Sequence, residues 1–158
     1  MLLDATEQVV QRVPLRVRRR VKWSECDPAG VVYTGRFCDY VLSAFELFMR
    51  HLLDLPEHEA RERLGFGTPA KALSLEFLAS LRPDDEFEMT VRVAAIRIHT
   101  FVLEIDAHNL TGRGLFRATL TPILIGHDDR TRSIELPDLL RASLERYRQG
   151  CSVAEATR

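Results

Sequence analysis

Residues 25–53 read ECDPAGVVYTGRFCDYVLSAFELFMRHLL, a turn-forming segment followed by a long apolar run. Pro28 and Gly30 punctuate the first part and predict a loop or turn. From about Thr34 to Leu53 the pattern changes, and apolar residues recur with the 3.6-residue period of a helix. A helix that is apolar around most of its circumference is normally buried, so we expect the fold to be built around it. The apolar positions that define this helix are Phe37, Tyr40, Val41, Ala44, Phe45, Phe48 and Leu52.

Segments with the two-residue period of a strand lie on both sides of this helix. Before it, residues 15–23 alternate between a basic face and an apolar face that only Arg19 interrupts. After it, the alternation indicates four consecutive antiparallel strands, the second bent near Ala94 and the last demoted to an edge or bulge by Pro122. Pro137 then opens a short amphipathic helix. The four later strands are expected at residues 72–80, 87–93, 101–107 and 115–125, with a hairpin turn over residues 109–114.

One very hydrophobic helix and one antiparallel sheet predict an α+β fold, in which five strands wrap around the helix and a short C-terminal helix caps it. The chain contains no repeat and no long linker, so we expect a single domain over residues 1–158. At its ends, residues 1–13 are expected to be a polar appendage of at most one or two helical turns. Residues 150–158 are expected to be a mobile tail.

The composition argues against several classes of protein. Lys and Arg number 22 and Asp and Glu 23, and this near-neutral balance counts against a nucleic-acid binder. No run of about 18 apolar residues is present to span a membrane, and the N-terminus lacks the pattern of a signal peptide. Three cysteines, without a C-x-x-C pair or histidines at metal-ligand spacing, favour a reduced, cytoplasmic protein without a metal.

Asp27 lies a few residues before the start of the helix, where free backbone N–H groups and the positive end of the helix dipole are found. A carboxylate and an array of N–H donors are the two components needed to hydrolyse an acyl derivative. The donors polarise the carbonyl and stabilise its oxyanion, while the carboxylate attacks it or activates water. The plainer interpretation is that the Asp27-Pro28 pair only initiates or caps the turn.

The string CDPAGVV at residues 26–32, followed by the apolar helix, resembles the signature of the 4-hydroxybenzoyl-CoA thioesterase family. Gly67-Thr68-Pro69, Thr100-Phe101 and the string RSIELP at residues 132–137 are weaker similarities, and the resemblance spans about residues 15–147. It implies the hotdog fold, a five-stranded sheet around the helix, and hydrolysis of an acyl-CoA thioester to free acid and coenzyme A. It also implies no separate cofactor, and a homotetramer made of two dimers with shared sites.

The resemblance assigns roles to individual residues of this chain. Asp27 corresponds to the catalytic carboxylate, which acts as nucleophile or general base. The backbone N–H near Thr34, with Tyr33 just before it, corresponds to the donor that polarises the thioester carbonyl. The positions expected to bind the nucleotide, phosphates or other parts of the acyl-CoA substrate are Thr68, Arg97, Thr100, Arg130 and Arg132. The three arginines in this set are suited to hold phosphates, but each could equally be a solvated surface charge.

One position departs from the hydroxybenzoyl-specific enzymes, in which an acidic residue on the helix meets the phenol hydroxyl of the substrate. The matching position here is Leu42, with Asp39 almost one turn earlier. A leucine cannot accept that hydrogen bond, and a buried unpaired hydroxyl is costly. We therefore expect Leu42 to face an apolar acyl group or an unsubstituted aryl group.

Two other functions fit the same fold. A hotdog dehydratase acting on hydroxyacyl thioesters needs a histidine with an acidic partner, whereas residues 25–35 contain no histidine. A non-catalytic protein that binds acyl-CoA needs no carboxylate at the helix start, although Asp27 alone does not prove turnover. Cys26 is interpreted as a small buried thiol rather than a nucleophile, because no histidine is near it in the sequence.

Overall fold

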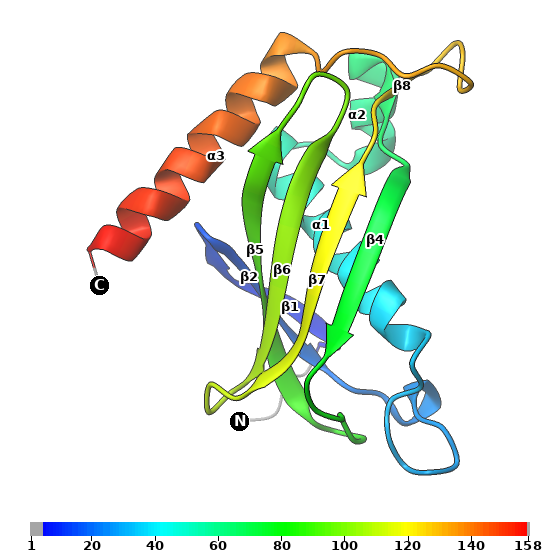
Figure 1. The fold of residues 1–158 in the computed structure, drawn as a ribbon, viewed down its shortest axis with the longest axis vertical. Coiled ribbons are helices and arrows are strands. Elements are labelled where there is room, and N and C mark those ends of the chain that lie inside the picture. The colour runs from blue at the N-terminus through cyan, green and yellow to red at the C-terminus, as the bar shows by residue number, and fades with distance from the viewer. Residues whose placement is uncertain (1–4, 158) are drawn as a thin grey trace.

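The computed structural model describes residues 5–157. Six antiparallel strands form one sheet in the order β1-β2-β5-β6-β7-β4, and one long helix lies along a face of that sheet (Figure 1). The strands are β1 (Glu7–Arg12), β2 (Leu15–Arg20), β4 (Ala70–Phe77), β5 (Glu86–Ile96), β6 (Phe101–Asn109) and β7 (Gly114–Pro122), and β3 (Phe66–Gly67) and β8 (Ile125–Gly126) form a separate ribbon. The helices are η1 (Trp23–Glu25), α1 (Arg36–Leu53), α2 (Glu57–Leu64) and α3 (Asp138–Ala156). The α+β class predicted from the sequence is confirmed.

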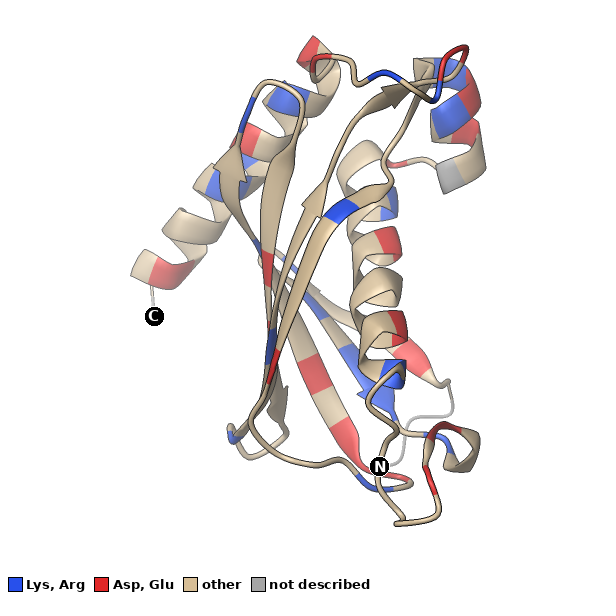
Figure 2. Cartoon of the chain, turned by 45° about the vertical axis from the view of Figure 1, so that its right-hand side comes forward, with Lys and Arg blue, Asp and Glu red and all other residues tan. Residues whose placement is uncertain are grey.

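The long helix α1 supplies the centre of the core. It begins at Arg36, two residues after the expected start, and ends at Leu53, where the following residue, Asp54, has the left-handed conformation with a φ of 52°. Only one side of α1 is covered, because a single sheet cannot enclose a helix completely. The other side is open, with Leu42 43% exposed and charged residues along it (Figure 2). The residues of α1 that are buried are Phe37, Tyr40, Val41, Ala44, Phe48 and Met49.

The C-terminal helix is longer than the short helix predicted from the sequence. It runs to Ala156, so residues 150–156 are helical where a tail was expected. The sheet provides a contact that holds α3 in place, at the point where the pairing of β2 with β5 ends with Leu15 opposite Val91. Next to this point the Tyr147 hydroxyl of α3 donates to the Val91 carbonyl and accepts from the Leu15 N–H, both at 2.6 Å. The buried side chains of α3 are Leu140, Ser143, Leu144, Tyr147 and Cys151.

The N-terminal segment also differs from the prediction. Residues 7–12 form strand β1, paired antiparallel to β2, so the sheet has six strands instead of five and the segment is no helical appendage. The sequence lacks an alternating apolar pattern here because both faces of β1 remain largely open, with Val9 and Val10 exposed. Backbone pairing, and an ion pair between Glu7 and Arg19 of β2, hold the strand instead.

Two further details concern the connections between elements. The expected bend in β5 is confirmed, since its register with β6 shifts between Val93 and Ala95. The polar segment after α1 contains helix α2, which ends at Leu64, where the following Gly65 has a φ of 71°. Among the described side chains of α2 only Ala60 is buried, so its sequence carries no apolar period.

Within residues 5–157 none of the helices has the length and apolar character needed to cross a bilayer.

Candidate active site

The segment that carries Asp27 is a small closed loop between η1 and α1. The Tyr33 N–H donates to the Glu25 carbonyl at 3.0 Å, and the Asp27 N–H donates to the Val31 carbonyl at 2.9 Å. At its tip the Gly30 N–H donates to the Asp27 carbonyl at 2.9 Å, with Gly30 at a φ of 78° that favours glycine. These bonds fix the backbone of Asp27 from both sides of the loop.

The Asp27 side chain is half-buried and only partly engaged. Its Oδ1 atom accepts a hydrogen bond from the Ala29 N–H at 2.8 Å, which is the local turn predicted by the plainer interpretation. Its other oxygen accepts no hydrogen bond from residues 5–157. The carboxylate therefore caps the turn and keeps one oxygen available for a substrate or a water molecule.

The start of α1 presents unpaired backbone donors. Arg36 and Phe37 donate to the carbonyls of Tyr33 and Thr34. The N–H groups of Thr34 and Gly35, both exposed residues, donate to no other group of the described chain. The Tyr33 side chain lies close to Gly35, where an added Cβ would meet its ring at 2.9 Å. The start of α1 therefore offers two free backbone N–H groups, and their role toward a thioester carbonyl stays a prediction.

A buried ionic network, which the sequence analysis did not assign, lies directly behind the Asp27 loop. Arg19 pairs with Glu7 of β1 and with Glu25 Oε1, the latter at 2.7 Å. Its guanidinium also lies 4.6 Å from the centre of the Tyr40 ring. The Ser43 hydroxyl donates to Glu7 at 2.5 Å. The only signal in the sequence was the charge of Arg19 on the apolar face of its strand.

Glu25 is the most fully engaged carboxylate of this network. Its Oε2 atom accepts from the Tyr40 hydroxyl at 2.8 Å and from the Lys22 N–H at 2.9 Å. Burial raises the pKa of Glu25, but the hydrogen bonds from Lys22, Arg19 and Tyr40 outweigh this, and the pKa is lowered below its ordinary value. Glu25 is therefore ionised in the folded protein and has no oxygen left for catalysis.

Cys26 does not have the environment of a nucleophile. Burial, followed by the nearby carboxylates of Glu25, Asp27 and Asp85, raises the pKa of its thiol. Its Sγ atom lies 3.8 Å from the Lys22 carbonyl. Because the thiolate is the reactive form, these neighbours make the thiol less reactive.

The residues expected to bind substrate fall into four places. Thr68 and Arg130 line one cleft of about 190 Å³ between α2 and the β3–β8 ribbon. Arg97 lies exposed in the β5–β6 hairpin, where its N–H donates to the Thr100 carbonyl, and Thr100 is itself buried at 7% exposure. Leu42 lies on the open side of α1. The last of these positions, Arg132, has a side chain that is 86% exposed, in the loop after β8.

Within one chain the Asp27 loop does not meet the expected coenzyme A positions, Thr68, Arg97, Thr100, Arg130 and Arg132. The loop before α1 lies at the lower end of the molecule in Figure 1, whereas the β5–β6 hairpin and the β3–β8 ribbon lie at the upper end. The structure therefore brings Thr68 and Arg130 together, and it separates both from the Asp27 loop.

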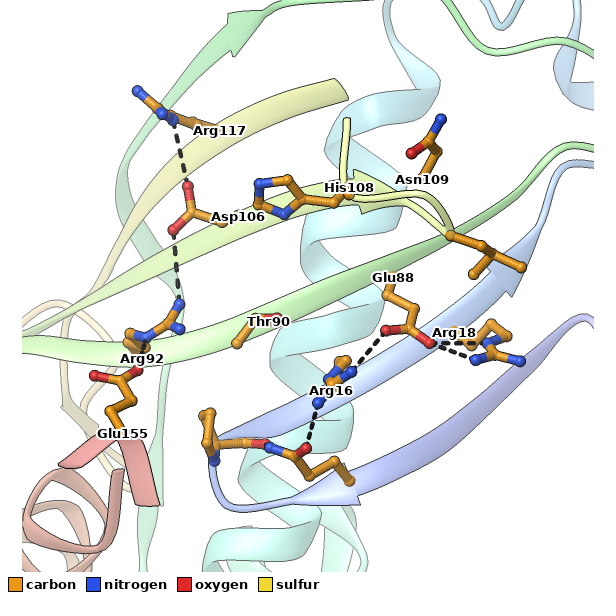
Figure 3. A pocket seen from close by; sticks show the side chains of 14 residues that line it. Arg16, Arg18, Glu88, Thr90, Arg92, Asp106, His108, Asn109, Arg117 and Glu155 are labelled. Atoms are coloured by element: carbon orange, nitrogen blue, oxygen red, sulfur yellow. Dashed lines mark hydrogen bonds and ion pairs between the residues drawn. The ribbon is translucent and has the colours of Figure 1, made fainter. Parts of the chain in front are cut away.

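A larger hollow, of about 910 Å³, lies on the outer face of the sheet, away from α1 (Figure 3). Glu88 accepts hydrogen bonds from Arg16 and Arg18, and Asp106 lies 3.4 Å from Arg117. The third carboxylate in its wall, Glu155, pairs with Arg92 at 2.6 Å. Since every carboxylate of this wall is engaged by an arginine, none has the partly free character of Asp27.

One long helix packed on one antiparallel sheet is the hotdog fold. Residues 21–144 match the family described as the Thioesterase-like superfamily, and the chain belongs to that superfamily. A comparison with curated proteins finds no match.

Solved structures with the same fold include several thioesterases. Slr0204, a 1,4-dihydroxy-2-naphthoyl-CoA thioesterase from Synechocystis, is 21% identical, with a TM-score of 0.73 over 82% of this chain and 93% of its own. BH1999, a gentisyl-coenzyme A thioesterase, is 19% identical, with a TM-score of 0.72 over 82% and 98%. The hypothetical protein SAV2348 from Staphylococcus aureus, solved in complex with CoA, is 15% identical, with a TM-score of 0.78 over 95% and 87%.

Proposed function

We propose that this protein is an acyl-CoA thioesterase in which Asp27 is the catalytic carboxylate. The observation that carries the proposal is the half-buried Asp27 carboxylate with one free oxygen, held in a closed loop that leads into a helix start with unpaired N–H groups. The superfamily and the thioesterases among the similar structures support the same general activity.

The proposed chemistry follows from these two components. The Thr34 N–H donates to the thioester carbonyl oxygen and stabilises the negative charge that develops there. As a nucleophile, Asp27 attacks the carbonyl carbon, the C–S bond breaks and CoA leaves as a thiolate. One water then hydrolyses the resulting anhydride to the free acid and protonated Asp27, whose proton passes to the thiolate. As a general base, Asp27 instead takes a proton from the attacking water and passes it to the departing sulfur. Neither route uses a metal or a further cofactor.

The substrate is proposed to reach from the Asp27 loop to a basic region. Thr68, Arg97, Thr100, Arg130 and Arg132 are proposed to bind coenzyme A, and the cleft shared by Thr68 and Arg130 supports this for those two. Leu42 is proposed to contact the acyl group, which is then apolar or an unsubstituted aryl group. The Staphylococcus aureus protein bound to CoA supports a CoA-linked substrate for this fold.

A complete site is proposed to need a second subunit. Strand β4 is an end strand of the sheet and, within residues 5–157, pairs only with β7, so its other edge is available to a partner. If two β4 strands pair antiparallel about a two-fold axis, the lower end of one subunit meets the upper end of the other. The Asp27 loop then lies toward the Thr68 and Arg130 of the partner. We propose such a dimer, and a tetramer of two dimers, in a cytoplasmic setting that suits the free cysteines Cys26, Cys38 and Cys151.

The second candidate function is a non-catalytic acyl-CoA-binding protein with the same fold. It shares the cleft at Thr68 and Arg130 but leaves the free Asp27 oxygen without a role. The dehydratase is disfavoured, because the loop and helix start over residues 25–35 contain no histidine.

The decisive experiment compares thiol release from a panel of acyl-CoAs by the wild type, Asp27→Asn and the control Asp84→Asn. The panel runs from short aliphatic to benzoyl, hydroxybenzoyl and phenylacetyl thioesters. Asparagine at position 27 can still accept from the Ala29 N–H, so the turn is retained while the charge is lost. Asp84 has a φ of 66°, which asparagine tolerates. Turnover by the wild type and Asp84→Asn but not by Asp27→Asn supports the enzyme, whereas binding without thiol release supports the binder.

A further inference from the structure

We propose that Glu25 is a positioning residue that holds the Asp27 loop in register with α1 and β2, an inference that rests on the proposed role of Asp27. No pattern in the sequence indicated this role for Glu25. It would act through Asp27 and would not touch the substrate.

The side chain of Glu25 joins three separate elements. Arg19 of β2 donates to Oε1 at 2.7 Å, and Tyr40 of α1 donates to Oε2 at 2.8 Å. The Lys22 N–H, at the start of η1, donates to Oε2 at 2.9 Å. With both oxygens bound by donors from a strand, a helix and its own turn, the carboxylate is fixed in three directions. Because both oxygens are already engaged by donors of the protein, the carboxylate serves as an anchor rather than as a base.

The backbone of Glu25 closes the loop that contains Asp27. Its carbonyl accepts the Tyr33 N–H at 3.0 Å, and the next residue, Cys26, forms a bridge with Val32. Asp27 follows two residues after Glu25, and the unpaired Thr34 N–H follows directly after Tyr33. The same residue therefore anchors both the carboxylate and the proposed carbonyl-polarising donor.

This arrangement has a consequence for the rate. Tyr40 and Glu25 connect the loop to the first turns of α1 from inside the core, where both residues are buried. A change at Glu25 releases the loop from the helix without removing any group that contacts the substrate. A misplacement of about 1 Å in a catalytic group is enough to lower a rate by about 100-fold. Such a defect lowers kcat and leaves substrate binding largely unchanged.

The test uses Glu25→Gln, Tyr40→Phe and the control Glu88→Gln in the full-length protein. Glu25→Gln removes the charge with little change in shape. Tyr40→Phe removes one hydrogen bond and no charge, and so remains informative if Glu25→Gln does not fold. Glu88 is a matched control, because it is likewise a carboxylate held by arginine side chains, those of Arg16 and Arg18, but on the outer face of the sheet.

Two readouts separate this inference from the proposed function. The first is hydrogen exchange of the Asp27, Gly30 and Tyr33 amides, which needs no turnover. We expect this exchange to be about tenfold faster in Glu25→Gln, and faster in Tyr40→Phe, but unchanged in Glu88→Gln. The second is kcat and KM for the best acyl-CoA of the panel. We expect kcat to fall by about 10- to 100-fold in Glu25→Gln, with KM within about threefold of the wild type.

The outcomes are distinct. Unchanged loop exchange in Glu25→Gln and Tyr40→Phe overturns the inference, and so does a wild-type kcat in folded Glu25→Gln. Faster loop exchange in a protein whose wild type releases no thiol supports the holding role of Glu25 and overturns only the thioesterase. A fall in kcat in Glu88→Gln equal to that in Glu25→Gln overturns the inference as well, because the effect is then not specific to the loop.

Discussion

Replacing Tyr147 with phenylalanine tests how α3 is joined to the sheet. The Tyr147 hydroxyl donates to the Val91 carbonyl and accepts from the Leu15 N–H, both at 2.6 Å. Leu15 and Val91 are fully buried, so water cannot replace the lost hydroxyl. Phenylalanine fills the same ring position beside Phe48, 5.0 Å away between ring centres, and leaves no cavity there. The loss is therefore that of two buried backbone groups left without partners, each about 1–2 kcal/mol, or about 2–4 kcal/mol in total.

Urea unfolding followed by circular dichroism at one fixed protein concentration measures this loss, since oligomerisation makes stability depend on concentration. Tyr33→Phe is the control, because the Tyr33 side chain is 60% exposed and its hydroxyl bonds to no group of residues 5–157. We expect the control to change the free energy of unfolding by less than about 0.5 kcal/mol. An equally small change in Tyr147→Phe, at an unchanged m-value, would refute the reasoning.

Three further predictions concern pH, specificity and a turn. Burial raises the pKa of Glu25 and Glu88, but their hydrogen bonds outweigh it, so both folded-state pKa values lie below the ordinary 4.5. Both carboxylates therefore stabilise the folded protein above pH 4.5, and this stabilisation is lost as the pH falls through the lower folded-state pKa values. Glu88→Gln should make the free energy of unfolding, measured by urea titration, fall less steeply at acid pH, and an unchanged pH dependence would contradict this. Leu42→Asp should raise kcat/KM for hydroxybenzoyl-CoA relative to benzoyl-CoA by about tenfold or more, because the new carboxylate can accept the phenol hydrogen bond, and an unaltered ratio would place position 42 away from the acyl group. Gly112→Ala should lower the free energy of unfolding by about 1 kcal/mol, because Gly112 has a φ of 90°, while thiol release stays at the wild-type level. A fall in specific activity of the folded variant would show that this hairpin influences the site.

Elements that carry their own periodicity were predictable from the sequence. The apolar repeat from Phe37 to Leu52 predicted α1 almost to the residue, and strict alternation predicted β2, β5, β6 and β7. Each of these elements has one buried side, so apolar residues recur in its sequence with the period of a helix or a strand. Strand β1 and helix α2 carry no such pattern, since few of their side chains enter the core. The structure of these two elements depends on their neighbours. Strand β1 depends on its pairing with β2, and helix α2 depends on its position after α1.

For the candidate site, the amino-acid sequence of residues 25–35 determined which groups are available. These are the Asp27 carboxylate, the turn at Gly30 and the backbone donors that follow Tyr33. Local hydrogen bonds within about ten residues form that loop, so a short stretch of sequence contains the information. Only the tertiary structure decided what lies behind it. Arg19, Glu25 and Tyr40 come from a strand, a turn and a helix, and they meet because the sheet curves around α1. The separation of Thr68 and Arg130 from Asp27 was decided in the same way, because the distance between two ends of a sheet depends on how its strands pair and not on their spacing in the chain.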